Sequence, residues 1–336
     1  MTTARTTRAA WYEKNGEARD VMVLGSLPLK APGAGEVCVR LATSGVNPSD
    51  VKSRRAKPLT DPWVVPHSDG AGIIEAVGEG VAKQRVGERV WIWNAQWQRP
   101  HGTASEAIVV PEDAPYRLPD TVSFDDAVSL PNLQLALALL QIAGPTASQA
   151  PHVLITGASG GVAGMLCQVA KLQGFVTIGT SRSRDKAEFA LAHGFDHVIG
   201  TDEETSKDRL EHITHGKGLN LVFDHLGGQS LINGLKSLAP FGTLVSYNIV
   251  QGPPTEDAFQ VMRQLLEKSL AIRCFSMHTF DADREKRRGL MNEAIALLAS
   301  QRVNFTPPQI FKLSEVQKTH ALLDQGLVSG KLVMHP

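Results

Sequence analysis

Two different spacings of apolar residues divide the chain. In the first third, apolar and polar residues alternate over short runs, which predicts strands at 36–42, 72–77, 89–93 and 106–110. Glycine and proline punctuate these runs, as is typical of turns between neighbouring strands. Because many short strands joined by such turns tend to close on themselves, we expect this part of the chain to form a partly open β-barrel.

The alternation ends near Thr121, and residues 122–143 take the spacing of a buried helix. From Pro151 onward, strand-like and helix-like runs follow one another. The expected strands are 152–156, 176–180, 198–199, 219–224, 243–247 and 270–275, and the expected helices are 162–172, 184–192, 230–238, 258–268 and 284–300. Repeated strand–helix units of this length predict an α/β domain with a doubly wound parallel sheet.

The end of the chain returns to the first pattern. Residues 311–313 and 331–334 are expected strands, and Ser314 is expected to cap a short helix between them. We therefore predict a barrel domain made by both ends of the chain, with the parallel-sheet domain inserted into it. The predicted bounds are 1–126 for the first part of the barrel domain, 127–276 for the parallel-sheet domain and 277–336 for a helix and the return. A substrate is expected in a cleft between two such domains.

The sharpest local motif is the run HVLITGASGGVAG at 152–164. A strand leads into a glycine turn, and the turn opens a helix. Glycine lets the main chain approach an anion closely, and the free N–H groups and positive dipole of the helix start attract it. The spacing Gly157-x-x-Gly160-x-x-Ala163 departs from the strict dinucleotide motif, and a turn without a ligand is the alternative. We expect a pyrophosphate to bind at Ser159, Gly160, Gly161 and Val162.

The strand that follows this turn ends in the run TSRSRDK at 180–186. A site for NAD usually places Asp or Glu at this point, where it binds the ribose hydroxyls. Ser181, Arg182 and Lys186 instead suit a doubly charged 2′-phosphate, and an Arg side chain also stacks on adenine. This composition predicts NADPH as the cofactor, and the alternative is a solvated helix start.

Composition narrows the class of protein. The 336 residues include 34 Lys and Arg and 34 Asp and Glu, so no net charge draws the chain toward nucleic acid or anionic lipid. No apolar run approaches the roughly 20 residues that span a bilayer. The three cysteines form no CxxC pair and no disulfide framework, which fits a reducing compartment. Residues 1–10 lack the apolar core of a signal peptide, so we expect a short tail and a cytoplasmic protein.

Several short motifs lie in a specific order along nearly the whole chain. They are GEV at 35–37, SGVNPSD at 44–50, PHSDGAG at 66–72, GERV at 87–90, GTASE at 102–106, the glycine turn, GTLV at 242–245 and GKLV at 330–333. In this order and spacing they resemble the medium-chain dehydrogenase/reductase superfamily, specifically its zinc-independent quinone reductase branch. The resemblance implies a GroES-like partly open barrel, a Rossmann domain and a homodimer joined through the Rossmann sheet.

The chain departs from the zinc-dependent members of this superfamily. Those members carry Cys where this chain has Asn47 and His where it has Ser68. Their third ligand falls near 131–134, where no Cys, His or acid stands. Such a set is not expected to hold zinc. Without a Lewis acid to stabilise an alkoxide, hydride transfer suits acceptors that delocalise negative charge, such as quinones and enones.

The resemblance also implies roles for individual residues. Asn47 is expected to face the nicotinamide ribose or the substrate, Asp50 to support the same loop, and Trp97 to lie against a flat acceptor. Further cofactor contacts are expected at strand ends and near the C-terminus: Ser246, Tyr247, Asn248, Phe275, Met277 and Lys331. Several quinone reductases present Tyr near the acceptor, but no Tyr follows Asn47 closely here, which leaves solvent or Lys52 as the proton source.

These observations favour NADPH-dependent, metal-free hydride transfer to quinones or related conjugated carbonyls. An enone or enal double-bond reductase of the same superfamily needs the same cofactor and is the alternative among enzymes. A non-catalytic NADPH-binding protein, either crystallin-like or RNA-binding, is the alternative from another class, since one fold serves several functions. Zero net charge and the lack of a basic aromatic tract argue against RNA. We expect a small-molecule partner, and neither nucleic acid nor a membrane.

Overall fold

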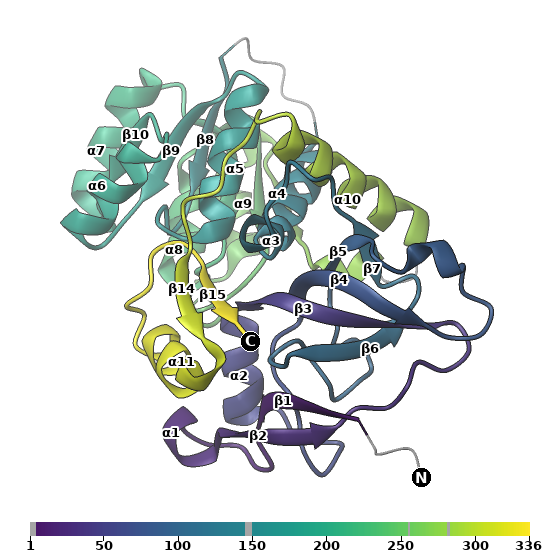
Figure 1. The fold of residues 1–336 in the computed structure, drawn as a ribbon. Coiled ribbons are helices and arrows are strands. Elements are labelled where there is room, and N and C mark those ends of the chain that lie inside the picture. Colours follow the sequence, from purple (N-terminus) through teal and green to yellow (C-terminus); the bar gives the residue numbers. More distant parts are fainter. Residues whose placement is uncertain (1–4, 145–149, 255, 281–282) are drawn as a thin grey trace. The chain divides into compact units, whose positions relative to one another are not determined.

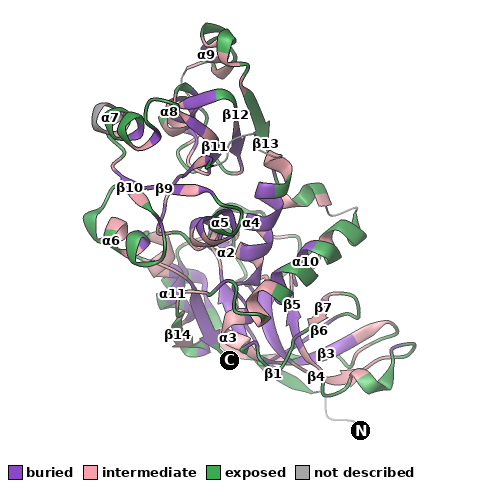
Figure 2. Cartoon of the chain, turned by 90° about the horizontal axis from the view of Figure 1, so that it is seen from above, coloured by how far each residue is buried: buried purple, intermediate pink, exposed green. Residues whose placement is uncertain are grey.

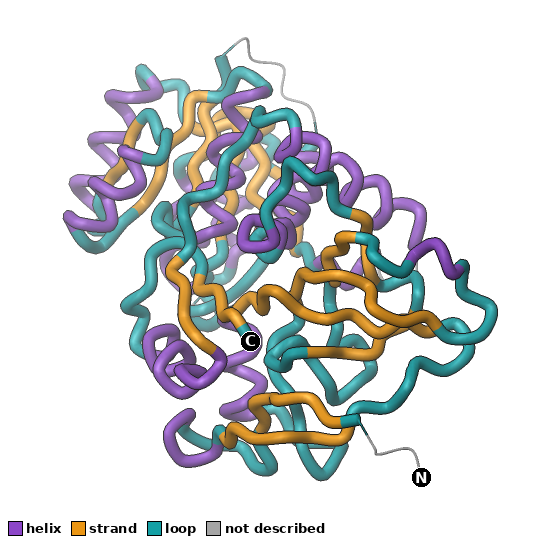
Figure 3. Tube along the Cα trace, viewed as in Figure 1, coloured by secondary structure: helices purple, strands orange, loops and turns teal. Residues whose placement is uncertain are grey.

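The computed structural model describes residues 5–144, 150–254, 256–280 and 283–336 (Figure 1). The chain divides into two compact units, the first made of residues 1–131 and 304–336 and the second of residues 132–303. Figure 3 shows that strands and loops dominate the first unit, whereas helices and strands alternate along the second. Over the described residues, no helix combines the length and the apolarity that crossing a bilayer requires.

A mixed sheet of seven strands organises the first unit. Six strands lie in the order β14 (Gln309–Lys312), β15 (Leu332–His335), β3 (Glu36–Val46), β4 (Asp69–Val77), β5 (Arg89–Ile92) and β7 (Pro115–Arg117), and β6 (Ala107–Pro111) pairs with β3. Along one edge, β3 pairs first with β6 and then with β15, while β4 follows its other edge. A strand shared in this way curves the sheet into a partly open barrel. A separate antiparallel pair consists of β1 (Thr6–Trp11) and β2 (Val23–Pro28).

Short helices complete the first unit. They are α1 (Ala18–Val21), α2 (Pro48–Ala56), η1 (Lys83–Arg85), α3 (Phe124–Ala127), η4 (Leu313–Glu315) and α11 (Val316–Asp324). Alternate positions of β3, namely Val37, Val39 and Leu41, enter one apolar cluster inside the barrel. The alternation seen in the sequence therefore marks the buried face of this strand.

The second unit is built on a parallel sheet of six strands. Their order is β10 (His197–Ile199), β9 (Val176–Thr180), β8 (His152–Ile155), β11 (Leu219–Asp224), β12 (Leu238–Ser246) and β13 (Ala271–Cys274). The helices are α4 (Leu130–Ala143), α5 (Gly161–Leu172), α6 (Arg184–Ala192), α7 (Glu203–Thr214), α8 (Gly228–Lys236), α9 (Ala258–Gln264), η2 (Leu266–Lys268), η3 (Met277–Phe280) and α10 (Arg284–Ala299). The strand order reverses between β8 and β11, where ligands bind in sheets of this kind. The predicted fold class, a partly open barrel with a doubly wound parallel sheet, is confirmed.

The inner strands of this sheet are buried, and its edge strand β13 is exposed. Leu154, Ile178, Val222 and Leu244, one from each of four neighbouring strands, pack with the helices in a single apolar cluster. Figure 2 shows the inner strands buried, whereas all four residues of the edge strand β13 are exposed. The inner strands read as continuous apolar runs because helices cover both faces of a parallel sheet.

The structure places the unit boundaries differently from the predicted bounds 127–276 and 277–336. The second unit extends to residue 303 and so includes α10. This helix bonds to α4, since Gln141 Nε2 donates to Glu293 Oε2 at 3.3 Å. The second unit also begins later, at residue 132, because α3 is held to the barrel: Thr43 Oγ1 donates to the carbonyl of Phe124 at 3.0 Å. An amphipathic helix shows the same apolar pattern whichever unit it covers, so its pattern does not reveal its unit.

Three smaller predictions were wrong. Ser314 does not cap a helix but lies inside η4, and α11 follows directly at Val316. The predicted helix 258–268 divides into α9 and η2 at Leu265. The predicted tail of residues 1–10 overlaps β1, which pairs with β2 along its whole length; residues 1–4 lie outside the described residues.

A substitution at Gly179 tests how the glycine turn packs on the sheet. A Cβ at this position of β9 would lie 2.5 Å from Ala158 Cβ, whereas a Cβ at Gly289 of α10 would meet nothing within 4 Å. We therefore expect Gly179→Ala to destabilise the second unit by about 1–3 kcal/mol. Gly289→Ala, the matched control, should stabilise it by about 0.5–1 kcal/mol. Urea unfolding followed by far-ultraviolet circular dichroism measures both, and equal midpoints for the two variants would contradict this packing.

Candidate active site

The glycine turn joins the end of β8 to the start of α5. Gly157 has a φ of 65°, in the left-handed region that favours glycine, and its N–H donates to Thr180 Oγ1 at 3.1 Å. The N–H of Ala158 donates to the carbonyl of Thr180 at 2.9 Å, and that of Gly160 to the carbonyl of Gly157 at 2.9 Å. The turn is therefore fastened to the end of the neighbouring strand β9, and α5 begins immediately after it at Gly161.

Neighbouring side chains closely approach two glycines of this turn, so a side chain at Gly157 or Gly161 would require these neighbours to shift. A Cβ at Gly157 would lie 2.3 Å from His225 Cε1, and a Cβ at Gly161 would lie 2.5 Å from Asn132 Nδ2. The first N–H groups of a helix have no hydrogen-bond partner within the helix. In α5 these are the N–H groups of Gly161, Val162 and Ala163. A turn that exposes unpaired N–H groups and excludes side chains fits a pyrophosphate. His225 stands at a strand end, where sequence analysis expects cofactor contacts, but its approach to Gly157 and that of Asn132 to Gly161 were not predicted, because both depend on the fold.

The end of β9 carries the residues expected at a 2′-phosphate. Ser181 Oγ donates to the carbonyl of Ser183 at 2.9 Å, and Ser183 Oγ caps α6 by accepting from the N–H of Lys186. Arg184 is paired with Glu188 at 2.8 Å on the exposed face of α6. Arg182 is exposed and, within the described ranges, has no ionic partner. The guanidinium best placed to meet an anion is therefore that of Arg182 rather than that of Arg184.

The other parallel strands end at the same edge of the sheet. The N–H of Tyr247 donates to the carbonyl of Asp224 at 3.0 Å, and the N–H of Phe275 donates to that of Ser246 at 2.9 Å. Ser246, Tyr247 and Phe275 therefore lie on adjacent strand ends. Asn248 is exposed in the next loop, and Met277 is half-buried at the start of η3. The structure thus gathers all the cofactor residues predicted in the second unit around one edge of its sheet.

The Asp224 carboxylate stabilises this edge. Its Oδ2 accepts from the N–H of Gly227 at 2.7 Å, and its Oδ1 accepts from Ser230 Oγ at 2.8 Å. Burial raises the pKa of Asp224, while these hydrogen bonds act in the opposite direction. The side chain of Thr156 joins the same edge, because its Oγ1 lies 3.0 Å from His225 Nδ1. The loop that follows β11 is held by polar contacts from both neighbouring strand ends.

In the first unit, Asn47, Asp50, Asp69 and Lys331 form what we call the Asn47 cluster. The amide of Asn47 uses both ends: its Nδ2 donates to Asp69 Oδ2 at 2.5 Å, and its Oδ1 accepts from Lys331 Nζ at 2.5 Å. The N–H of Asn47 donates to Asp50 Oδ2 at 2.7 Å. Two of the predicted catalytic residues, Asn47 and Asp50, are therefore brought together with the predicted cofactor residue Lys331. The Asp69 carboxylate also accepts a hydrogen bond from the main chain of Asn94.

Local sequence explains why Asn47 lies at this point. The strand β3 ends at Val46, and Pro48 begins α2 with a φ that suits a first helical turn. Asn47 occupies the position before the helix, where an Asn side chain usually caps the first turn. Here Asp50 accepts from the N–H of Asn47, and both ends of the Asn47 side-chain amide contact the cluster. Gly45 provides the space, because a Cβ there would lie 3.2 Å from Lys331 Nζ.

Burial controls the charges of the Asn47 cluster. Burial raises the pKa of Asp50 to about 7, although the hydrogen bond from the N–H of Asn47 and the charge of Lys331 act against this. Burial also raises the pKa of Asp69 and lowers that of Lys331, although these two groups attract each other. Two carboxyl groups and one ammonium group in a desolvated site do not all ionise easily. Burial therefore favours the neutral form of each of these groups, and their mutual contacts favour the charged forms.

These residues do not fit a zinc ion. The ammonium group of Lys331 contacts Asn47 at the position where zinc-dependent members of the superfamily have a ligand, and a second cation beside it would be repelled. Ser68 Oγ points to Gln96 Oε1, 3.4 Å away. Within the described parts of the chain, no group of three His, Cys, Asp or Glu side chains is arranged to hold a metal ion.

Of the tryptophans in this part of the chain, Trp97 is the one predicted near the acceptor, and it differs from Trp91 in its surroundings. Trp91 is fully buried in β5 and belongs to the barrel core. Trp97 is 43% exposed in a turn closed by its own N–H, which donates to the carbonyl of Asn94 at 2.9 Å. Gln96 is held by the carbonyl of Val65 at 3.0 Å. Of these residues, Trp97 is the aromatic side chain that remains accessible to a ligand.

Comparison with known proteins agrees with this arrangement. Residues 33–120 match the family model of the alcohol dehydrogenase GroES-like domain, and residues 161–298 match that of zinc-binding dehydrogenases. A quinone oxidoreductase of Pseudomonas aeruginosa is 31% identical over 308 residues, which are 91% of this chain and 92% of the relative.

Solved structures are also similar over the full length. The quinone oxidoreductase of Pseudomonas syringae superposes with a TM-score of 0.85 at 27% identity, covering 98% of this chain and 100% of the other. The quinone oxidoreductase of Escherichia coli, solved in complex with NADPH, superposes with a TM-score of 0.84 at 26% identity, covering 99% and 100%. On these grounds the chain belongs to the medium-chain dehydrogenase/reductase superfamily, in its quinone oxidoreductase-like branch.

Proposed function

We propose that this protein is an NADPH-dependent oxidoreductase that transfers hydride to quinones or related conjugated carbonyls without a metal ion. The observation that carries the proposal is the contact of the Lys331 ammonium with Asn47, the residue that stands where zinc-dependent members of the superfamily have a ligand. The curated relative and the solved structures cited above, all quinone oxidoreductases, support the same reading.

We assign the cofactor contacts to the edge of the parallel sheet. The pyrophosphate is assigned to Ser159, Gly160, Gly161 and Val162, the 2′-phosphate to Ser181, Arg182 and Lys186, and the nicotinamide half to Ser246, Tyr247, Asn248, Phe275 and Met277. The NADPH complex of the Escherichia coli relative supports this choice of cofactor. The unpaired N–H groups of α5 and the cation of Arg182 are the features that an anionic dinucleotide requires.

NADPH supplies the hydride, so the protein has to bind, orient and stabilise charge. An acceptor carbonyl gains negative charge on its oxygen as it is reduced. We assign the ammonium of Lys331 and the amide of Asn47 as the donors that stabilise this oxygen, with Asp50 and Asp69 holding them in place. Trp97 is assigned to the flat face of the acceptor. Lys52 is exposed, and solvent is the assigned source of the proton.

We also propose that the protein is a cytoplasmic homodimer. The exposed edge strand β13 offers unpaired main-chain groups and the exposed side chain of Ile272, and a second copy would cover both by extending the sheet. Cys38, Cys167 and Cys274 are free thiols, as expected in a reducing compartment. The mass in solution tests the dimer.

The acceptor is tested by product analysis. Purified protein should oxidise NADPH in the presence of 1,4-benzoquinone and yield hydroquinone. Turnover of an enone to the saturated ketone, with no quinone reduction, would assign the protein to the double-bond reductases instead. Tight binding of NADPH without turnover of either acceptor would contradict an enzymatic function.

A substitution at Arg182 tests whether this residue makes the protein prefer NADPH to NADH. Arg182→Ala removes a charge-assisted contact with the 2′-phosphate, which is worth about 1.5–3 kcal/mol. The KM for NADPH should therefore rise roughly ten- to hundred-fold, whereas the KM for NADH should stay unchanged. Arg184→Ala is the matched control, because Arg184 already pairs with Glu188, and it should change neither value more than about twofold. If the KM for NADPH and the KM for NADH rise equally in Arg182→Ala, Arg182 does not contact the 2′-phosphate.

The raised pKa of Asp50 predicts how stability varies with pH. Its pKa is about 7 in the folded protein and 3.8 ordinarily, so between these values the folded protein retains a proton that the unfolded chain has lost. The stability that this group contributes is full below about pH 3.8 and is lost as the pH rises toward 7. Asp50→Asn removes the titration. The Tm of the variant minus that of the wild type should therefore increase from pH 4 to 7 and then level off.

Thermal unfolding of both proteins across this pH range measures the difference. Asp120→Asn is the control, because the side chain of Asp120 is 98% exposed and should give a constant difference. A constant difference for Asp50→Asn as well would show that Asp50 ionises normally.

A further inference from the structure

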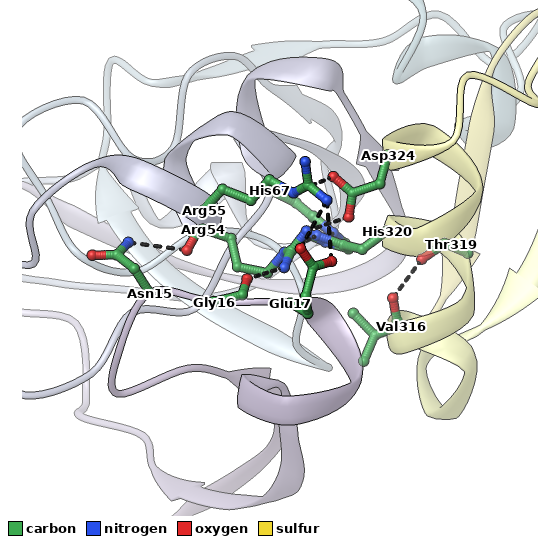
Figure 4. Close-up of polar contacts among 10 residues, drawn as sticks. All are labelled: Asn15, Gly16, Glu17, Arg54, Arg55, His67, Val316, Thr319, His320 and Asp324. Carbon is green, nitrogen blue, oxygen red and sulfur yellow. Dashed lines mark hydrogen bonds and ion pairs between the residues drawn. The ribbon is translucent and has the colours of Figure 1, made fainter.

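A line of buried polar side chains crosses the interior of the first unit (Figure 4). Arg54 of α2, His67 of the segment before β4 and His320 of α11 each have no exposed surface. The three residues come from distant parts of the sequence. Buried polar groups cost stability unless each one is hydrogen-bonded, so their contacts with one another need to be complete.

The imidazoles of His320 and His67 continue the line of contacts that starts at Arg54. Arg54 Nε lies 3.3 Å from His320 Nδ1, and His320 Nε2 lies 3.0 Å from His67 Nε2. The rings of His67 and His320 are nearly parallel, with centroids 5.3 Å apart. The guanidinium is neutralised at its other end, where Arg54 Nη2 lies 2.5 Å from Asp324 Oδ2.

The same line continues from His67 to the Asn47 cluster. His67 Nδ1 lies 2.8 Å from Ser44 Oγ, and Ser44 Oγ lies 2.9 Å from Thr103 Oγ1. Thr103 Oγ1 then lies 2.6 Å from the main-chain carbonyl of Asp69. We call the series from Arg54 through His320, His67, Ser44 and Thr103 to this carbonyl the buried line.

The donor and acceptor roles of the groups in the buried line give all its hydrogen bonds the same direction, from Arg54 toward Asp69. A guanidinium only donates, so His320 Nδ1 accepts, and the neutral ring carries its proton on Nε2. His320 therefore donates to His67 Nε2, and His67 carries its proton on Nδ1 and donates to Ser44. Ser44 in turn donates to Thr103, whose hydroxyl donates to the carbonyl of Asp69. Each group between these two ends accepts a hydrogen bond from the group before it and donates one to the group after it. The loss of one group therefore changes the hydrogen bonds of its neighbours along the line.

The charges agree with this direction. Burial, with the neighbouring Arg54 as a second cause, lowers the pKa of His320 to about 3. Burial also lowers the pKa of His67 well below its ordinary value, with further contributions from His320 and Lys331. Both rings are therefore neutral near pH 7, as the assigned hydrogen bonds require.

The segment at the end of the buried line has little room to move. A Cβ at Gly70 would lie 2.7 Å from Thr103 Cγ2, and a Cβ at Gly102 would lie 2.2 Å from the carbonyl of His67. His67 itself has a φ of 75°, which a non-glycine residue rarely adopts. The backbone of Asp69 is thus fixed by packing and by Thr103, while its carboxylate accepts from Asn47 Nδ2 at 2.5 Å.

We propose that His67 and His320 are positioning residues, which hold Asp69 and through it orient the Asn47 amide for the reduction. This inference rests on the proposed function, because it assigns an origin to the orientation of Asn47. Proton transfer is not part of the role, because the line starts at a guanidinium that only donates hydrogen bonds and ends at a main-chain carbonyl that only accepts them.

Substitutions in α11 test the role without disturbing the Asn47 cluster directly. His320→Leu removes both hydrogen bonds of the ring, whereas His320→Gln keeps an N–H at the position of Nε2. Thr319→Val is the matched control. Thr319 is the neighbouring residue and is fully buried, and its hydroxyl donates to the carbonyl of Val316 at 2.9 Å (Figure 4). It also lies 3.6 Å from Met334 Sδ, and neither contact belongs to the buried line.

Two measurements follow for each variant. With 1,4-benzoquinone as acceptor, His320→Leu should lower kcat roughly ten- to hundred-fold and leave the Kd for NADPH within about twofold. The side-chain amide resonance of Asn47, observed after selective ¹⁵N labelling of asparagine, should shift in the same variant. His320→Gln should recover most of both values, and Thr319→Val should change neither.

Wild-type values of kcat and of the Asn47 resonance in folded His320→Leu would overturn the proposal. A second measurement does not depend on that variant: ¹⁵N spectra of the wild-type imidazoles should show the proton on Nδ1 of His67 and on Nε2 of His320, and the opposite tautomer on either ring would also overturn it. If the wild type reduces neither quinone nor enone, the proposed function fails, while the Asn47 resonance still tests the positioning.

Discussion

The ammonium of Lys331 against the amide of Asn47 is the interaction on which the candidate site depends. A buried cation needs partners, and it finds them in Asn47 directly and in Asp50 and Asp69 through their charges. The partners come from the end of β3, the start of α2 and the start of β4, so the last strand of the chain completes a site begun near its start. The same charge would repel a zinc ion beside Asn47, which supports the proposed transfer of hydride to acceptors that stabilise negative charge themselves.

The second unit meets a different requirement, the binding of an anion by main-chain groups that we propose for the glycine turn. Parallel strands that end at one edge bring the glycine turn, Arg182 and Phe275 to that edge. The turn is held by Thr180 on one side and lies against His225 on the other. Rigid support of this kind keeps N–H groups in place before a ligand arrives, which reduces the cost of binding.

Polar groups inside the barrel unit are connected rather than scattered. Arg54, His320 and His67 would each be costly if left alone in the interior, but together they satisfy one another and end on Asp69. The apolar clusters around the strands supply the free energy of folding, and the buried line restricts the unit to one arrangement of its polar groups. Stability and the geometry of the site thus rest on different sets of contacts.

The sequence by itself determined the periodic elements, the glycine turn and the cations after β9, because these features depend on neighbours a few residues away. Strands β9 and β11 and helix α6 have the predicted bounds for this reason. Only the tertiary structure decided that α10 packs with α4, that Ser314 lies within η4, and that Asn132 and His225 close on the glycines. It also decided the contact of Arg54 with His320, which are 266 residues apart. Periodicity reports which face of an element is buried, but the partner of a buried polar group depends on where the whole chain brings its distant segments.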